Sequence, residues 1–163
     1  MKQKIIGASD YGQFISDSKE LKAYMAGIGS HAFYFSVYST ALDDEKIKQV
    51  CSWIEEQFPG ADYYGCTSFA NIVQGQSNND KIVVVCTLAE SASTRFKIMH
   101  FDSSKTSIGD FAERLFEYID ENSWIKSAEL IVASALTHSR NVLCGLASRN
   151  PESIAISGDC TFN

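Results

Sequence analysis

The sequence predicts a single α/β or α+β domain in which helices pack on the faces of a mixed β-sheet. Apolar, β-branched segments alternate along the chain with segments whose apolar residues recur at helical spacing. Two of these helical segments each lie between two strand-like segments, an order typical of parallel strand pairs. The chain has 163 residues, of which 45% are hydrophobic, and this is enough to bury the core of one domain.

The first strand–helix–strand unit lies in residues 32–64. Residues 32–39 are aromatic or β-branched nearly throughout, which predicts a strand that is buried on both faces. The helix expected over residues 44–57 has one apolar stripe and ends before a Pro-Gly pair. The strand after it ends at Tyr64, and a loop begins at Gly65. If the two strands pair directly, the crossover between them is right-handed.

The segment before this unit, residues 1–30, is predicted to contain one helix. Residues 1–11 carry little pattern and are expected to be loose. Apolar residues in 13–26 recur at helical spacing, and the glycines in 27–30 suit the end of a helix. We therefore divide the chain into this N-terminal segment and an α/β domain over residues 31–163.

The segments after the first unit are expected to make the sheet mixed. Residues 71–74 predict a short strand, and the polar residues 75–80 predict a loop. Residues 81–88 are rich in valine, and apolar and polar residues alternate in 94–101. We expect these last two segments to form an antiparallel hairpin.

A second strand–helix–strand unit is predicted near the end of the chain. Ser107 is expected to cap the amphipathic helix that precedes it. The unit itself consists of a strand over 129–136, a helix over 139–148, and a strand over 154–156 that runs into the small residues 157–160. Both units therefore end in a loop of small residues. If both final strands lie in one sheet and run the same way, the two loops open on the same edge and form a shared pocket.

Composition excludes several classes of function. The formal net charge is −6, and no cluster of lysine or arginine forms the basic stripe that nucleic-acid binding requires. No apolar run approaches the roughly 20 residues of a membrane span, so we expect no membrane insertion. The five cysteines form no close pairs, and the three histidines are scattered, which argues against disulfides and structural zinc. We therefore expect a cytoplasmic protein.

The first loop carries the strongest candidate site. Gly65 permits a sharp turn and a close approach to a ligand, and Cys66, Thr67 and Ser68 add one thiol and two hydroxyls. The alternative is a plain strand-to-turn junction whose hydroxyls bond their own backbone. Cys66 would act as a nucleophile only beside a base, and no recognised catalytic spacing is present. We expect ligand binding here and no catalytic residue.

Four further residues are candidates for the same pocket. His138 opens the predicted last helix, where it is either a haem ligand or an exposed residue of the helix cap. Arg140 and Asn141 lie in the first turn, and Arg140 either pairs with a carboxylate or phosphate or is solvated. Asp159 either binds the ammonium group of a ligand or stabilises the turn around it.

The residues from Gly65 to Ile72 resemble the Gly-Cys-Ser-Thr-Ala-Gly-Glu-Ile-like motif of the FIST domain, a sensory module of bacterial signalling proteins. Gly65, Cys66 and Ile72 match the motif, the two hydroxyl residues are interchanged, and Asn71 stands where the motif favours an acid. The order of strands and helices is also similar over residues 32–163. The C-terminal region that the family normally has after this point is absent, so we expect either an excised N-terminal piece or a short relative.

The resemblance implies a small-ligand-binding input domain, with amino acids or similar metabolites as ligands. It adds Asn71 to the candidate ligand-binding residues. The output partners that it implies are a diguanylate cyclase, a histidine kinase or a chemoreceptor, and any catalysis belongs to them. Two alternatives stay open, a haem-based nitric oxide sensor with His138 as iron ligand and a thiol-dependent enzyme that uses Cys66. In the first interpretation the chain needs no cofactor. The ligand, the partner and the oligomeric state are not specified by the sequence.

Overall fold

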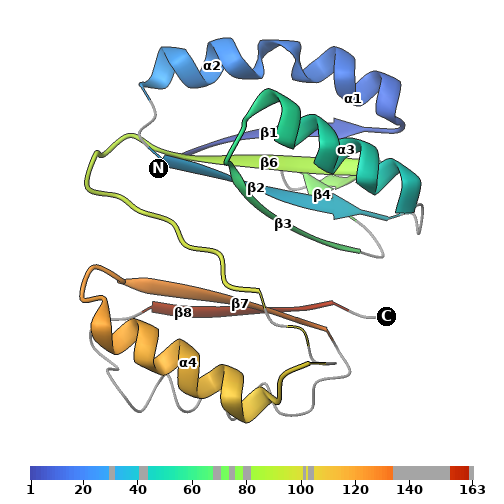
Figure 1. Ribbon diagram of the computed structural model, residues 1–163. Coiled ribbons are helices and arrows are strands. Elements are labelled where there is room, and N and C mark those ends of the chain that lie inside the picture. Colours follow the sequence, from blue (N-terminus) through green and yellow to red (C-terminus); the bar gives the residue numbers. More distant parts are fainter. Residues whose placement is uncertain are drawn as a thin grey trace. The chain divides into compact units, whose positions relative to one another are not determined.

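The computed structural model describes the backbone of residues 1–29, 32–40, 44–67, 71–73, 76–78, 82–100, 102, 105–133 and 155–161. The chain forms two compact units, which are coloured along the sequence in Figure 1. Unit 1 is Met1–Ile98 and unit 2 is Met99–Asn163. Each unit is described by itself.

Unit 1 is built on a mixed four-stranded sheet, as the sequence predicts. Its strands lie in the order β1-β6-β2-β3. β2 and β3 are parallel, whereas β6 runs antiparallel to both β1 and β2. The bounds of the four strands are β1 Lys2–Ala8, β2 Ala32–Ser39, β3 Asp62–Thr67 and β6 Ile82–Ala89.

The described helices of unit 1 cover one face of this sheet (Figure 1). They are α1 Tyr11–Asp17, the 3₁₀ helix η1 Ser18–Glu20, α2 Leu21–Ile28 and α3 Asp44–Gln57. α1 begins where the Asp10 side chain accepts a hydrogen bond from the Gln13 N–H, and α2 ends at Gly29, whose φ of 65° is left-handed. Val50 and Ile54 of α3 are fully buried, which confirms the apolar stripe predicted for this helix.

Strand register assigns the side chains of the sheet to two faces. The face under the helices carries the apolar core, which includes Phe35, Val84 and Leu88, all with no exposed surface. Alternate residues point to the opposite face, which we call the second face. The Gln3 side chain there donates a hydrogen bond to the Thr87 hydroxyl at 3.2 Å. By alternation and register, the second face comprises Gln3, Ile5, Tyr34, Ser36, Tyr38, Tyr64, Cys66, Val83, Val85 and Thr87.

The expectation that residues 1–11 are loose is wrong. Residues 2–8 form β1, which pairs along its whole length with β6, from Lys2 beside Leu88 to Ala8 beside Ile82. Only Ile6 and Ala8 of β1 are fully buried, so the strand has too few apolar residues for its pattern to be recognised. The helical region that follows is also divided, because η1 separates α1 from α2.

The predicted hairpin of 81–88 with 94–101 is also wrong. The first segment is β6, but residues 94–100 form no strand, and Phe101 lies outside the described residues. The alternation in this segment is nevertheless real, because Phe96 and Ile98 are half-buried while Arg95 and Lys97 are exposed. β1 and β2 already occupy both edges of β6, and therefore no edge is left for a third strand.

A small antiparallel pair follows β3. The predicted short strand is confirmed as β4 Asn71–Val73. Its partner, β5 Gln76–Asn78, lies within the segment that the sequence predicts to be a loop. Polar residues can form such a pair because backbone groups, not side chains, make the ladder.

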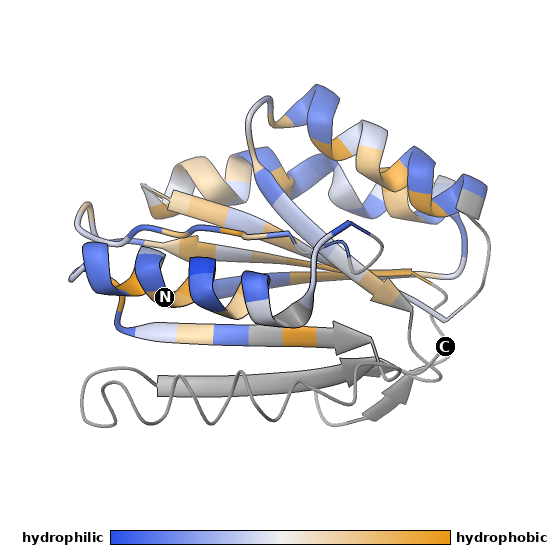
Figure 2. Ribbon diagram, turned by 60° about the horizontal axis from the view of Figure 1, so that its bottom comes forward, coloured by the Kyte–Doolittle hydropathy of each residue, from blue (hydrophilic) through white to orange (hydrophobic). Residues whose placement is uncertain are grey.

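Unit 2 contains α4 Ile108–Glu121 and two parallel strands, β7 Ser127–Ala133 and β8 Ala155–Thr161. The predicted cap is confirmed, since the Ser107 hydroxyl accepts a hydrogen bond from the Asp110 N–H at 3.1 Å. Figure 2 shows apolar and polar residues alternating around α4. Leu115 is the buried centre of its apolar stripe, which packs with Met99 and Phe111. The predicted helix over 139–148 lies outside the described residues.

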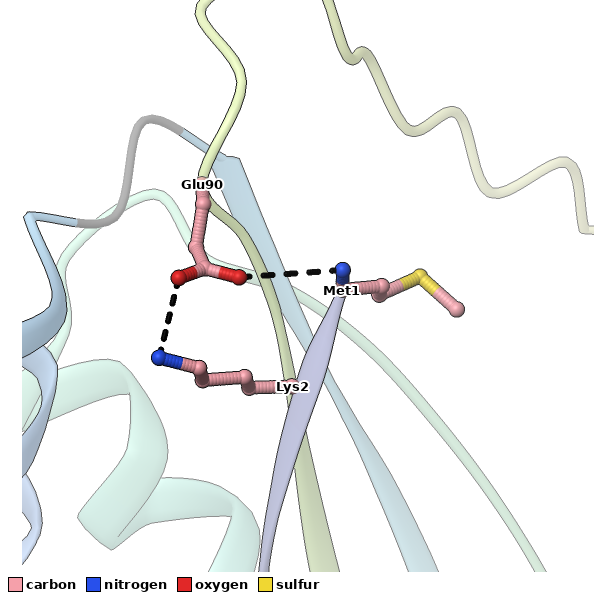
Figure 3. Close-up of polar contacts among 3 residues, drawn as sticks. All are labelled: Met1, Lys2 and Glu90. Carbon is pink, nitrogen blue, oxygen red and sulfur yellow. Dashed lines mark ion pairs between the residues drawn. The ribbon is translucent and has the colours of Figure 1, made fainter.

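An ion pair joins the ends of β1 and β6 (Figure 3). The Lys2 Nζ lies 2.9 Å from Glu90 Oε1, and the amino group of Met1 lies 3.9 Å from Glu90 Oε2. The hydrogen bond from Lys2 lowers the pKa of the Glu90 carboxyl, and the same bond raises the pKa of the Lys2 ammonium. This exposed pair therefore favours folding while both groups are charged.

We predict that Glu90→Gln lowers the urea midpoint of unfolding slightly at neutral pH. Because the pKa of Glu90 is lower in the folded chain, its contribution is present above the unfolded pKa of about 4.3 and is lost as the pH falls through the folded pKa. Below about pH 3 the variant and the parent should therefore have similar midpoints. Glu56→Gln, on the exposed side of α3, is the control. A pH-independent difference for Glu90→Gln would contradict the role of the ion pair.

Candidate functional site

The carboxyl ends of β2 and β3 lie side by side in unit 1. Ser39, the last residue of β2, is the register partner of Thr67, the last residue of β3. One position earlier, Tyr38 is the partner of Cys66. In sheets with parallel strands, ligands commonly bind outside the carboxyl ends of the strands. These ends are therefore the candidate site of unit 1.

Gly65 has a different structural role from the one that the sequence suggests. It lies within β3 and not in a loop, and it is not among the described glycines with positive φ. A Cβ at this position would lie 2.8 Å from the Val37 carbonyl oxygen and 3.3 Å from the Val37 Cβ. Glycine is required here because β2 approaches β3 closely, on the face that the helices cover.

We predict that Gly65→Ala destabilises the fold by about 1–3 kcal/mol, because the added methyl group meets backbone atoms that cannot move independently. Gly27→Ala is the matched control, since a Cβ there has no neighbour within 4 Å. Gly27 lies inside α2, where alanine is favoured over glycine by about 0.5–1 kcal/mol. Urea unfolding of both variants measures the difference, and a neutral Gly65→Ala would contradict the close approach.

Cys66 lies on the second face beside a group of tyrosines. Tyr38 is its neighbour on β2, and Tyr64 is two residues before it on β3. The Tyr64 ring stacks on the Tyr34 ring, with centroids 6.0 Å apart. The Cys66 side chain is half-buried. The site therefore combines one thiol with aromatic surface and phenol hydroxyls.

The tyrosines of this site are not among the residues that the sequence predicts to bind a ligand. Alternation within residues 32–39 indicates that Tyr34 and Tyr38 share one face of their strand. It does not indicate which residues of the next strand lie beside them. The parallel register supplies that information, and it brings Tyr38 to Cys66.

The remaining candidates of the first loop are only partly described. Thr67 ends β3, and Asn71 begins β4. Ser68 lies between them, outside the described residues. The backbone therefore places Thr67 at the carboxyl edge of the sheet, as expected for a binding residue.

The candidates from the second half of the chain are described only in part. His138, Arg140 and Asn141 lie outside the described residues. Asp159 lies in β8, which continues through residues 157–160, so the loop predicted there is a strand. Among the described strands, β8 pairs with β7, whereas β3 belongs to the sheet of unit 1. The shared pocket therefore stays a prediction.

A second polar cluster lies between α3 and β3, on the face that the helices cover. The Tyr63 hydroxyl donates a hydrogen bond to the Glu55 carboxylate, which raises the pKa of Tyr63 to about 12. Burial raises the pKa of the neighbouring Cys51 thiol, and the Glu55 charge adds to this effect. Both groups therefore stay protonated at neutral pH, and the cluster joins α3 to β3 without offering a nucleophile.

Cys86 is the most deeply buried of the described thiols. It has no exposed surface, and its sulfur lies 4.0 Å from the Met25 sulfur. Burial raises its pKa to about 12. An environment of this kind makes a cysteine inert and part of the core.

We predict that alkylation of the native protein at neutral pH spares Cys86 and modifies Cys66 and Cys51 faster. A pKa of about 12 leaves Cys86 with about 1000-fold less thiolate than an ordinary thiol. Peptide mapping by mass spectrometry separates the sites, and labelling in urea provides the fully exposed reference. Labelling of Cys86 at the rate of Cys51 without denaturant would contradict its buried position.

The described residues offer no evident metal site. Those residues contain no group of three or more histidine, cysteine or acidic side chains that could hold a metal ion. His100 is exposed, and His138, the predicted iron ligand, lies outside the described part. The haem-based sensor and the thiol-dependent enzyme therefore stay alternatives to the predicted ligand-binding domain.

Comparison with known proteins gives one family. The FIST N domain matches residues 32–161, which is most of the chain. Comparisons with curated proteins and with solved structures gave no match. In the part of the chain that the structure describes, no helix is long and apolar enough to span a membrane. The chain belongs to the FIST N domain family, as the motif at Gly65–Cys66 suggests.

Proposed function

We propose that this chain is a cytoplasmic sensory domain that binds a small ligand at the carboxyl ends of β2 and β3. FIST domains are sensory domains of signal-transduction proteins, which supports the general class. The ligand, in this proposal, is an amino acid or a similar metabolite. The chain itself has no catalytic residue in this proposal, and any catalysis belongs to an output partner such as a diguanylate cyclase or a histidine kinase.

The observation that carries the proposal is the register of β2 with β3. It makes Tyr38 and Cys66 neighbours on the second face, one position before the last pair of the two strands. The last pair of the ladder is Ser39 with Thr67, so this pair of residues lies at the carboxyl ends of both strands. Aromatic surface with a few convergent polar groups is typical of small-molecule sites. The Tyr38 phenol can donate a hydrogen bond to the carboxylate group of an amino acid.

Signalling in this proposal requires two conformations of the domain. A ligand shifts their populations only by the difference between its affinities for the two. In this proposal the close approach of β3 to β2 at Gly65, where a Cβ would lie 2.8 Å from the Val37 carbonyl oxygen, is common to both conformations. The residues after it, from Cys66 onward, are the ones whose positions a ligand would select.

We predict that a thermal-shift screen with amino acids and related metabolites identifies a stabilising ligand. At 100 times its dissociation constant, a ligand stabilises the folded state by about 2.7 kcal/mol, which raises the melting temperature by about 5–10 °C in a chain of this size. Tyr38→Phe and Cys66→Ala should weaken the shift. Cys51→Ala, which removes a thiol from the opposite face, should leave it unchanged. Equal loss in all three variants would contradict the proposed location, and no shift across the panel would contradict the ligand class.

A further inference from the structure

We propose that three aromatic rings form a relay from the candidate site to the segment that ends unit 1. The rings are those of Tyr64, Tyr34 and Phe96, and we call them the aromatic relay. The segment is residues 91–98, which we call the connecting segment and which leaves the end of β6 in Figure 1. Release of Phe96 from Tyr34 is, in this proposal, the conformational step that ligand occupancy controls.

The geometry of the relay is continuous. Tyr64 stacks on Tyr34 at an interplanar angle of 25°, with centroids 6.0 Å apart. Phe96 meets the same Tyr34 ring edge to face, at 72° and 4.8 Å. Both arrangements are favoured geometries for aromatic pairs. Tyr34 therefore contacts β3 on one side and the connecting segment on the other.

The connecting segment contacts the sheet of unit 1 through the Phe96 ring. Residues 94–98 join no strand ladder, and their burial alternates. Thr94, Phe96 and Ile98 are half-buried, whereas Arg95 and Lys97 are exposed. Segments without ladder hydrogen bonds open locally at low free-energy cost. The contact of Phe96 with Tyr34 is thus a contact that a small change on the second face can break.

Phe96 lies close to the boundary between the two units. Unit 1 ends at Ile98, and Met99 already packs with the Leu115 cluster of α4. Only two residues thus lie between Phe96, which packs within unit 1, and Met99, which packs within unit 2. Loss of the contact between Phe96 and Tyr34 therefore frees the chain close to the residue where it leaves unit 1.

The relay begins on the strand that carries the proposed site. Tyr64 and Cys66 are two residues apart on the second face of β3. In this proposal, a ligand that moves Cys66 also moves Tyr64. In this respect the inference rests on the proposed function. The contact itself requires no ligand and is tested without one.

The test is limited trypsin digestion of the full chain, followed by mass spectrometry. Trypsin cleaves after the exposed Lys97 when the connecting segment is released, and cleavage after Lys48 in α3 reports opening elsewhere in unit 1. Tyr34→Leu keeps an apolar side chain but removes the ring. We expect this variant to raise cleavage at Lys97 relative to Lys48 by about 2- to 10-fold, the range that corresponds to the loss of one aromatic pair.

Phe33→Leu is the matched control, because Phe33 is the adjacent residue of β2 and its ring packs against Phe35 and Phe58 under the helices. It should leave the ratio of Lys97 to Lys48 cleavage unchanged. An equal rise in both variants, or no rise with Tyr34→Leu, would overturn the relay.

Tyr64→Leu tests the first contact of the relay. We expect a smaller rise in the cleavage ratio, since Tyr34 then loses the ring that holds its orientation. Tyr34→Leu with Tyr64→Leu should raise the ratio no further than Tyr34→Leu alone, because both act through one contact. Additive effects of the two substitutions would show that Tyr64 acts separately and would overturn the relay. Since no ligand is present, these results are independent of whether the ligand screen succeeds.

Discussion

At one point along the β2–β3 pair, the two strands leave no room for a side chain. A Cβ on Gly65 would lie 2.8 Å from the carbonyl oxygen of its register partner Val37, so the observed pairing of the two strands needs a glycine at this position. Tyr38 consequently lies beside Cys66, and both strands end together at Ser39 and Thr67. The candidate site, the orientation of its side chains and the start of the aromatic relay all depend on this pairing.

The two faces of the unit 1 sheet differ in composition and therefore in what they can do. The face under the helices is closed by apolar side chains such as Phe14, Phe35 and Ile54, none of which has exposed surface. Burial of these apolar side chains stabilises the fold, but it offers no polar group that could bind a ligand. The second face mixes tyrosines with hydroxyl and thiol groups, and Tyr34 and Tyr64 on it are only half-buried. Polar groups within aromatic surface can recognise a ligand and also respond to it.

The sequence predicts the helices and the mixed sheet well because their signals are local. α3 and α4 both follow from a stripe of apolar residues, and the Ser107 cap follows from one short motif. β1 is not predictable in this way. Its partner β6 lies far along the chain, and Ile6 and Ala8 are too few to indicate burial. The same limit explains the error in residues 94–100, where alternation reports which side chains are covered and not whether a ladder forms.

The candidate site is predictable in part for the same reason. Gly65 and Cys66 are recognisable from a motif, but a glycine in a sequence indicates only that a larger residue does not fit at that position. It does not distinguish a turn from a close approach of two strands. Tyr38 cannot be recognised as a site residue until the register of β2 with β3 is known. Predicting a site residue that comes from a neighbouring strand thus requires the strand pairing, and local sequence patterns do not reveal that pairing.

The pairing of Tyr38 with Cys66 is tested most directly by disulfide trapping. Tyr38→Cys should form a disulfide with Cys66 under mild oxidation, because register partners in neighbouring strands lie within the Cα separation that a disulfide spans. Tyr34→Cys, four residues earlier on the same face, should not link to Cys66. Peptide mapping identifies the linked residues. A link from the position of Tyr34, or none from that of Tyr38, would contradict the register and the site built on it.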